Sequence, residues 1–223
     1  MKAVVFDLYG TLLPIEGLST AAARAGAADP EAFVAAWRRK QLEYAFVTSL
    51  SQTYRDFDTL TALALEHTCA LFGLTLDATQ RQWLTEALAE LPPYDDVVPA
   101  LEGLRRQGLP LAVLTNGTRA SAEAALARAG IQPLLDDVLS VEAVRVYKPD
   151  PRVYALVLAR FDCAPDDVVF VSSNGWDAAG AAAFGFRVAW CNRARLPAET
   201  LVPGPQTTLG GLDELASFVK RSR

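Results

Sequence analysis

Five short runs of apolar residues recur along the chain, and longer stretches with helical periodicity separate the later ones. Runs of this length rich in Val, Leu and Phe indicate β-strands. Ser121–Ala129 and Arg152–Phe161 instead show the spacing of amphipathic helices. Strands that alternate with helices predict a parallel sheet covered by helices on both faces. The predicted strands are Ala3–Phe6, Leu109–Leu114, Val138–Ser140, Val168–Val171 and Arg187–Trp190.

The segment from residue 15 to residue 93 differs because it has helical periodicity and no convincing strand pattern. Pro92 and Pro93 end this block. We therefore expect an α/β core domain formed by residues 1–14 and 94–223, with a helical cap subdomain, residues 15–93, inserted after the first strand. We expect a Pro- and Gly-containing loop over residues 201–208. The helices expected in the cap are Glu31–Leu50, Thr59–Phe72 and Ala78–Leu91.

Charge and cysteine content narrow the class of protein. The net charge is −5 and no long basic run occurs, so nucleic acid is not an expected partner. No apolar stretch reaches the roughly 20 residues of a membrane span, and the chain begins without a signal-peptide pattern. The three scattered cysteines, Cys69, Cys163 and Cys191, favour reduced thiols and a cytoplasmic location. The single histidine, His67, argues against a histidine-based triad or zinc site.

Polar residues with catalytic potential stand at the carboxyl ends of the predicted strands or just before a helix. The carboxyl ends of parallel strands meet at one edge of a sheet, so these side chains are expected to share a crevice. Taken one at a time, each has a plainer interpretation as a helix cap, a turn residue or a solvated lysine. The joint pattern is what favours catalysis. The residues are Asp7, Thr115, Asn116, Lys148, Ser172, Asn174 and Asp177.

The opening segment Phe6-Asp7-Leu8-Tyr9-Gly10-Thr11 resembles the first motif of the haloacid dehalogenase superfamily: a hydrophobic run, Asp, two residues, then Gly-Thr. Other segments resemble its (S)-2-haloacid dehalogenase branch, and the resemblance runs through nearly the whole chain. It implies a Rossmann-like parallel-sheet core of the haloacid dehalogenase type with an inserted all-helical cap. The segments that carry it are Trp37–Tyr44, Leu114–Gly117, Val146–Asp150 and Phe170–Asp177, and the last, with Trp between Asn and Asp, is the most specific.

This resemblance implies hydrolytic dehalogenation of (S)-2-haloalkanoic acids to (R)-2-hydroxyalkanoic acids. The Asp7 carboxylate would displace the halide from behind, with inversion, and form an ester. Water would then attack the ester carbonyl, activated by Asp177 with help from Asn174. Lys148 would keep Asp7 ionised and oriented. Supporting roles around Asp7 and the substrate carboxylate are implied for Thr11, Thr115, Tyr154 and Ser172.

The resemblance also implies a substrate pocket with a halide site and an apolar wall. Arg38 and Asn116 would meet the departing halide. Arg38 and Leu42 lie four residues apart on an expected helix and so share a face. Arg39 stands beside Arg38, and the choice between these arginines depends on the resemblance. The expected wall is Tyr9, Leu42, Phe57 and Trp176, for which ordinary core packing is the plainer interpretation.

Two positions separate this chain from the phosphatases of the superfamily. By resemblance, a phosphatase carries a second acid at the position where this chain has Tyr9, and a metal-binding acid at the position where this chain has Ser173. A hard divalent cation would find too few carboxylates here, and a departing halide needs no proton, so we expect neither metal nor cofactor.

Three alternatives stay open: a small-molecule phosphatase of the same superfamily, a catalytically silent binding protein, and a fluoroacetate-preferring dehalogenase of the same branch. The resemblance also suggests a homodimer formed through the cap.

Overall fold

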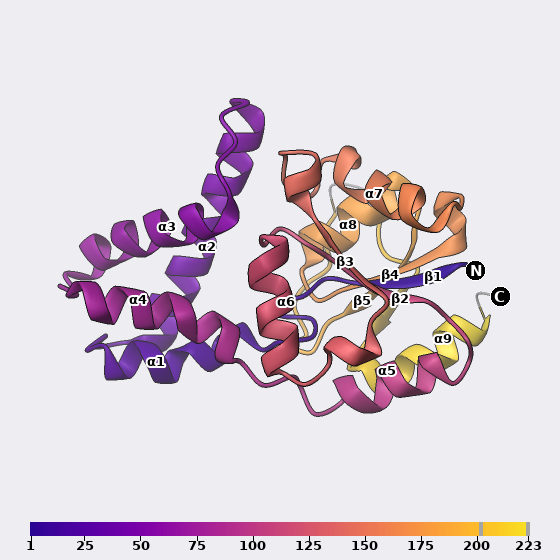
Figure 1. Ribbon diagram of the computed structural model, residues 1–223, viewed down its shortest axis with the longest axis horizontal. Helices are drawn as coiled ribbons and strands as arrows, with labels where there is room; N and C mark the ends of the chain where they lie inside the picture. Colours follow the sequence, from indigo (N-terminus) through magenta and orange to yellow (C-terminus); the bar gives the residue numbers. More distant parts are fainter. Residues whose placement is uncertain (201–202, 222–223) are drawn as a thin grey trace.

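The computed structural model describes residues 1–200 and 203–221, and a six-stranded parallel sheet forms its centre (Figure 1). The strand order is β3-β2-β1-β4-β5-β6. From β1 the chain adds β2 and then β3 on one side, and it then crosses over to place β4 on the other side of β1. The carboxyl ends of β1 and β4 therefore border the crevice where open α/β sheets bind their ligands. The strands are β1 Ala3–Phe6, β2 Leu111–Thr115, β3 Asp137–Ser140, β4 Val168–Ser172, β5 Arg187–Cys191 and β6 Thr207–Leu209.

The five predicted strands are confirmed with small shifts at their ends. Strand β2 begins at Leu111 rather than Leu109, and Pro110 between them has no N–H to donate to a ladder. The predicted loop over residues 201–208 is wrong for Thr207 and Thr208, which belong to β6 and pair with β5. Residues 201–202 of that loop lie outside the described residues. A three-residue edge strand is too short to show a clear alternation in the sequence.

The sheet is buried on both faces, as its apolar strands predict. Val4 and Phe6 of β1 belong to one apolar cluster, and Ala3 and Val5 belong to the other. This alternation follows from the two-residue period of a strand. Helices α5 (Val97–Arg105), α6 (Arg119–Arg128) and α9 (Leu215–Arg221) cover the first face, and α7 (Pro151–Phe161) and α8 (Gly175–Phe184) cover the second.

Four helices of residues 15–93, the segment expected to form the cap and called the cap below, lie beside the sheet (Figure 1). Asp29, Asp56 and Asp77 cap α2, α3 and α4 by accepting backbone N–H bonds at the first turn. The helix expected over Ala78–Leu91 ends at Glu86, and a 3₁₀ turn continues the chain to Glu90. The cap helices are α1 Leu18–Arg24, α2 Pro30–Leu50, α3 Phe57–Phe72 and α4 Ala78–Glu86.

The two connections between cap and core are tied together at Tyr94. Its N–H donates to Leu12 O at 3.1 Å, and its hydroxyl donates to the Glu16 carboxylate at 2.7 Å. The Arg193 guanidinium lies 4.2 Å from the Tyr94 ring centroid and bonds both oxygens of Asp96. These contacts fix where the cap leaves and rejoins the sheet.

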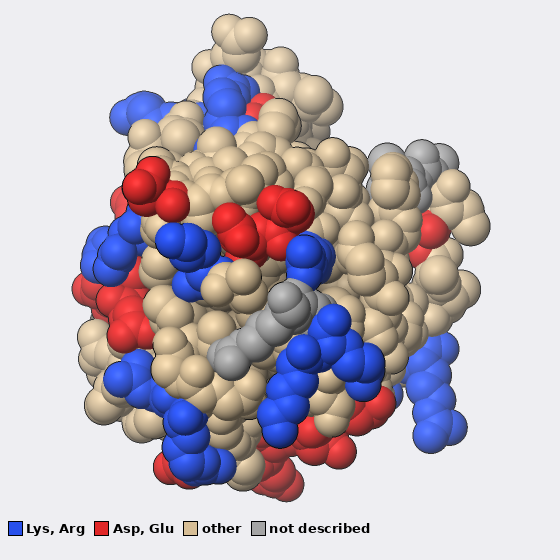
Figure 2. Space-filling view, turned by 90° about the vertical axis from the view of Figure 1, so that its right-hand side faces the viewer, with Lys and Arg blue, Asp and Glu red and all other residues tan. Residues whose placement is uncertain are grey.

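The face of the core away from the cap carries basic and acidic side chains intermingled, without an extended patch of one sign (Figure 2). Within residues 1–200 and 203–221, no helix combines the length and the apolar character needed to cross a membrane.

Candidate active site

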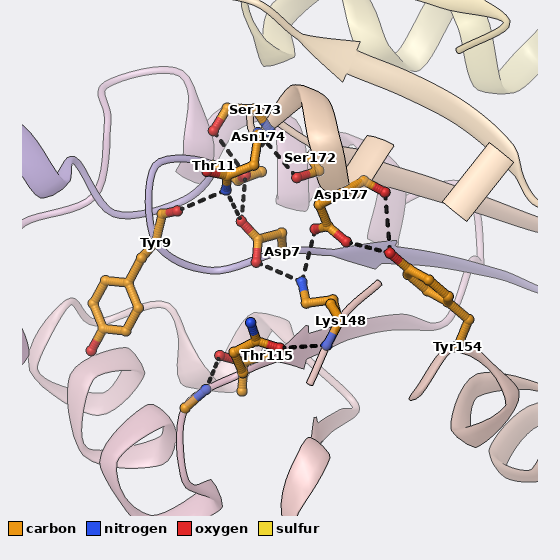
Figure 3. A network of polar contacts seen from close by, with 12 residues as sticks. Asp7, Tyr9, Thr11, Thr115, Lys148, Tyr154, Ser172, Ser173, Asn174 and Asp177 are labelled. Atoms are coloured by element: carbon orange, nitrogen blue, oxygen red, sulfur yellow. Dashed lines mark hydrogen bonds and ion pairs between the residues drawn. The ribbon is translucent and has the colours of Figure 1, made fainter. Parts of the chain in front are cut away.

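Asp7 follows β1 directly and points into the crevice beside β4 (Figure 3). Its N–H donates to Val171 O at 2.9 Å, which ties the residue to β4. Lys148 Nζ donates to Oδ1 at 2.7 Å, while Asn174 Nδ2 and Thr11 Oγ1 donate to Oδ2 at 2.8 and 3.1 Å. Both carboxylate oxygens are thus held, and the side chain keeps 9% of its surface exposed.

The turn after Asp7 depends on a glycine. Gly10 has φ +89°, and a Cβ there would lie 3.0 Å from Ser173 Oγ. Glycine adopts this left-handed conformation without a steric penalty. The turn lets Thr11 reach back both to Asp7 and to Ser173, whose N–H donates to Thr11 Oγ1 at 2.9 Å.

Lys148 is buried between two carboxylates. Its side chain is 1% exposed, and Nζ donates to Asp7 Oδ1 at 2.7 Å and to Asp177 Oδ2 at 2.8 Å. Its backbone N–H donates to Asn116 Oδ1 at 3.0 Å, which links the loop after β2 to the lysine. Burial opposes the charge, but Asp177 and then Asp7 outweigh it and raise the pKa of Lys148 above its usual value. The residue is therefore a fixed cation at neutral pH, not a solvated lysine.

Asp177 is the third residue of α8 and is fully buried. Its side chain does not cap the helix, because Oδ2 accepts from Lys148 and Oδ1 accepts from the Tyr154 hydroxyl at 2.8 Å. Burial raises the pKa of Asp177, while Lys148 and Tyr154 oppose this. Burial, then the Asp177 charge, raises the pKa of Tyr154 far above its usual value, so the phenol remains a donor.

Ser172 and Thr115 lie at the ends of β4 and β2 and are both buried. Ser172 Oγ accepts from the N–H of Asn174 at 3.2 Å, and Thr115 Oγ1 accepts from the N–H of Gly117 at 3.0 Å. Among the described residues, neither hydroxyl bonds to the Asp7 carboxylate. The two side chains therefore shape the loops that carry Asn174 and Asn116.

The cap contributes Arg38 from α2. Its guanidinium donates to Gln41 Oε1 at 2.6 Å and interacts electrostatically with Asp7, Tyr9 and Asp177. Burial lowers the pKa of Arg38, but a guanidinium stays protonated in proteins. Arg39 is exposed. The structure thus brings Arg38, and not its neighbour, to the crevice.

A cavity of about 340 Å³ lies between cap and core, and Tyr9, Arg38 and Phe57 line it. Burial raises the pKa of Tyr9 to about 12, so its phenol is neutral. The other two expected wall residues are not part of its lining. Leu42 is half-buried, and the Trp176 ring packs edge-to-face on Phe46, with centroids 5.4 Å apart.

Sequence reasoning missed Gln41, which lines this cavity beside Arg38 and is buried. Its Nε2 donates to Thr61 Oγ1 at 2.5 Å and fixes the amide that receives Arg38. The sequence contained a signal for Gln41, because it lies three residues after Arg38 on the expected helix, and residues three apart share a helix face as residues four apart do. It also missed Asp58, an acid on the cavity wall at the start of α3.

The side chains around Asp7 do not fit a divalent cation. Such ions take several oxygen ligands, commonly carboxylates. In the part of the chain that the structure describes, no three His, Cys, Asp or Glu side chains gather as a metal site would require. The position between the carboxylates of Asp7 and Asp177 is filled by the Lys148 ammonium.

Comparison with known proteins agrees with this geometry. The family model of haloacid dehalogenase-like hydrolases matches residues 1–185. An (S)-2-haloacid dehalogenase of Pseudomonas putida is 37% identical over 222 residues, covering 100% of this chain and 98% of the relative.

Two solved structures are also close to the chain. A crystal structure of an L-2-haloacid dehalogenase superposes with a TM-score of 0.96 at 38% identity, over 99% of both chains. The L-2-haloacid dehalogenase of Xanthobacter autotrophicus with chloropropionic acid covalently bound superposes with a TM-score of 0.92 at 35% identity, over 99% of this chain and 98% of that one. The chain therefore belongs to the haloacid dehalogenase-like hydrolases and, within them, to the (S)-2-haloacid dehalogenase family.

Proposed function

We propose that this protein hydrolyses (S)-2-haloalkanoic acids to (R)-2-hydroxyalkanoic acids and halide through an ester to Asp7. The observation that carries the proposal is the Asp7 carboxylate itself. Asp7 follows β1, next to which the chain crosses from one side of the sheet to the other. One of its carboxylate oxygens accepts from the buried Lys148 ammonium, and the other accepts from the Asn174 amide and the Thr11 hydroxyl. Such a group is a preorganised nucleophile.

In the first step, an Asp7 oxygen attacks C2 of the substrate from the side opposite the halogen. The new C–O bond forms as the C–halogen bond breaks, its electron pair leaves with the halide, and C2 inverts. Arg38 and Asn116 bind the departing halide in this proposal, while Ser172 and nearby N–H groups bind the substrate carboxylate. The charge interaction between Arg38 and Asp7 supports this placement of the halide site.

In the second step, water adds to the carbonyl carbon of the Asp7 ester, and Asp177 takes its proton. The ester C–O bond to the product then breaks, the product oxygen takes the proton that Asp177 holds, and the Asp7 carboxyl group releases its remaining proton to solvent, which restores the carboxylate. A raised pKa suits a base that works near neutral pH. Asn174 bonds Asp7 Oδ2 and would hold the ester for this attack.

The decisive assay follows halide and (R)-lactate released from (S)-2-chloropropionate in excess chelator. We expect full turnover under these conditions, because the reaction as proposed uses no metal or cofactor. Asp7→Asn should abolish turnover, while Asp95→Asn, an exposed acid, serves as the matched control. A requirement for magnesium, or an active Asp7→Asn variant, would overturn the proposal. A single turnover in ¹⁸O-water should place the label in Asp7 and leave the lactate hydroxyl unlabelled.

Paired variants of the adjacent arginines test the halide site. Arg38→Met should lower kcat/KM by at least a hundredfold, because a charged hydrogen-bond partner of the leaving group is lost. Arg39→Met should stay within about twofold of the parent, since Arg39 is exposed. Equal effects of the two substitutions would remove Arg38 from the site.

The alternatives have distinct outcomes in the same assay. Magnesium-dependent release of phosphate from a phosphoester would mark a phosphatase. Fluoride release from fluoroacetate that exceeds chloride release would mark a fluoroacetate-preferring enzyme. A bound haloacid without turnover would mark a silent binding protein.

We further propose that residues 15–93 act as the cap, that the protein forms a homodimer through it, and that it works in the cytoplasm. The exposed apolar side chains Val47 and Leu50 on α2 and Leu71 on α3 support the dimer. Three free cysteines support a reducing compartment. Light scattering coupled to gel filtration tests the dimer, and a monomeric mass at assay concentration would exclude it.

A further inference from the structure

The cavity beside Tyr9 is larger than a short haloacid needs. Its volume of about 340 Å³ falls in the range of pockets that bury drug-sized ligands. 2-Chloropropionate, by contrast, carries a single methyl group on its reacting carbon. In Figure 3 the Tyr9 ring points away from the ion-paired cluster of Asp7, Lys148 and Asp177. Tyr9 and Arg38 line the cavity and the ion-paired cluster does not, so the cavity adjoins the site through these two residues.

Small side chains line the cavity on both sides of the cap–core seam, beside the charged residues Asp58, Glu86 and Arg128. Helix α6 forms the core side and contributes Ala122 and Ala124. The cap side includes Ala62 of α3 and Ala89 of the 3₁₀ turn after α4. Alanine leaves room between helices that larger side chains would fill, and Phe57 extends the apolar wall at the inner end.

Polar contacts connect the two sides of the seam at both ends of α6. At the amino end of α6, Asp58 of the cap accepts hydrogen bonds from the Thr118 and Ser121 hydroxyls at 2.9 and 2.7 Å. At its other end, Arg128 of the core pairs with Glu90 of the cap at 3.3 Å. The space between these bridges is thus part of the folded structure.

We infer that this cavity receives the alkyl group on C2, so that the substrates are 2-haloacids with chains longer than propionate, such as 2-halohexanoates. The inference rests on the proposed function. A buried methylene contributes a free energy equivalent to about fourfold in binding. The kcat/KM for (S)-2-bromohexanoate should therefore exceed that for (S)-2-bromopropionate, and the shared bromide keeps the leaving group constant.

Blocking variants give the test. Ala62→Leu and Ala89→Leu should lower kcat/KM for the hexanoate more than tenfold and leave the propionate within about twofold. Ala70→Leu is the matched control, because Ala70 is an exposed residue of the same helix outside the cavity lining. Urea unfolding of all three variants confirms that each is folded.

Three results would overturn the inference. The first is a wild-type hexanoate kcat/KM more than tenfold below that of the propionate. The second is an equal loss for both substrates in the blocking variants, which would make the cavity an access path. In either case the proposed function survives, because propionate still releases bromide. The third is no bromide from either substrate, which would remove the proposed function together with the inference.

Discussion

Replacing Lys148 with Met removes the cation between Asp7 and Asp177 and leaves their two carboxylates buried. Lys148 makes two charge-assisted hydrogen bonds, at 2.7 and 2.8 Å. Bonds to charged groups contribute about 1.5–3 kcal/mol each, and breaking a buried ion pair from one side costs about 3–5 kcal/mol. We therefore expect Lys148→Met to lower the free energy of unfolding by about 3–5 kcal/mol at pH 8.

This loss should shrink as the pH falls. Burial already raises the pKa of Asp177, and Lys148 opposes that shift. Without the cation, the folded state binds a proton on Asp177 more tightly than the unfolded chain does. Stability then increases as the pH falls toward the carboxyl range, because the folded state holds more protons. At pH 5 the difference from the parent should be clearly smaller than at pH 8.

Urea unfolding followed by tryptophan fluorescence measures both values, since the chain has four tryptophans. Lys40→Met is the matched control: Lys40 pairs with Glu43 at 2.9 Å on the surface, where a pair contributes less than about 1 kcal/mol. Adding Asp177→Asn to Lys148→Met should recover part of the loss. If Lys148→Met costs no more than Lys40→Met, or the same at both pH values, the buried-charge reasoning is refuted.

The remaining predictions concern the groups around this ion pair. Tyr154→Phe removes a donor that lowers the pKa of Asp177, so the acid limb of the kcat profile should move to higher pH with a kcat loss of about tenfold. Gly180→Ala would place a Cβ 2.5 Å from Pro149 Cβ and 2.8 Å from the Tyr154 hydroxyl, and should cost about 1–3 kcal/mol in urea unfolding. The pKa of Lys148 is raised, so its contribution to stability should persist up to about pH 10 and be lost above that, as thermal unfolding against pH would record.

Each of these predictions has a control or a contrary outcome. Gly103→Ala, in the open middle of α5, should leave stability unchanged or slightly raised, because alanine favours a helix. An unmoved acid limb in Tyr154→Phe would show that Asp177 does not set it. If loss of the Lys148 charge already lowers the temperature of thermal unfolding at a pH well below 10, the assignment of Lys148 as a buried cation is contradicted.

The central strands and three of the cap helices were predictable because each has a strong local signal, whereas the seven-residue α1 was not predicted. Strand β1 is fully apolar and is followed at once by an acid, and Asp29–Pro30 marks the start of α2 as a cap followed by proline. The residues of the polar cluster were predictable for a different reason, since most of them follow strands whose carboxyl ends share one edge, and Lys148 stands just before a helix.

What escaped prediction depends on contacts between distant segments. β6 is a strand only because it pairs with β5, and its three residues carry no alternation of their own. Arg38 and Gln41 of α2 line the cavity while Leu42 does not, because the tilt of the cap over the core decides which α2 side chains face the seam. Helical periodicity shows which side chains share one face of a helix, but it does not show which face contacts the other domain.

The position of β1 at the centre of the sheet has a consequence for synthesis of the chain. β1 pairs with β2 on one side, and on its other side Ala3 pairs with Val168 of β4, so this second edge of β1 waits for β4. At about 5–20 residues per second, that wait is roughly ten to thirty seconds. The helices of residues 15–93 pack mostly on near neighbours and can form during this interval. We expect nascent chains to carry a folded cap while the edge of β1 that faces β4 is still unpaired and open to chaperones.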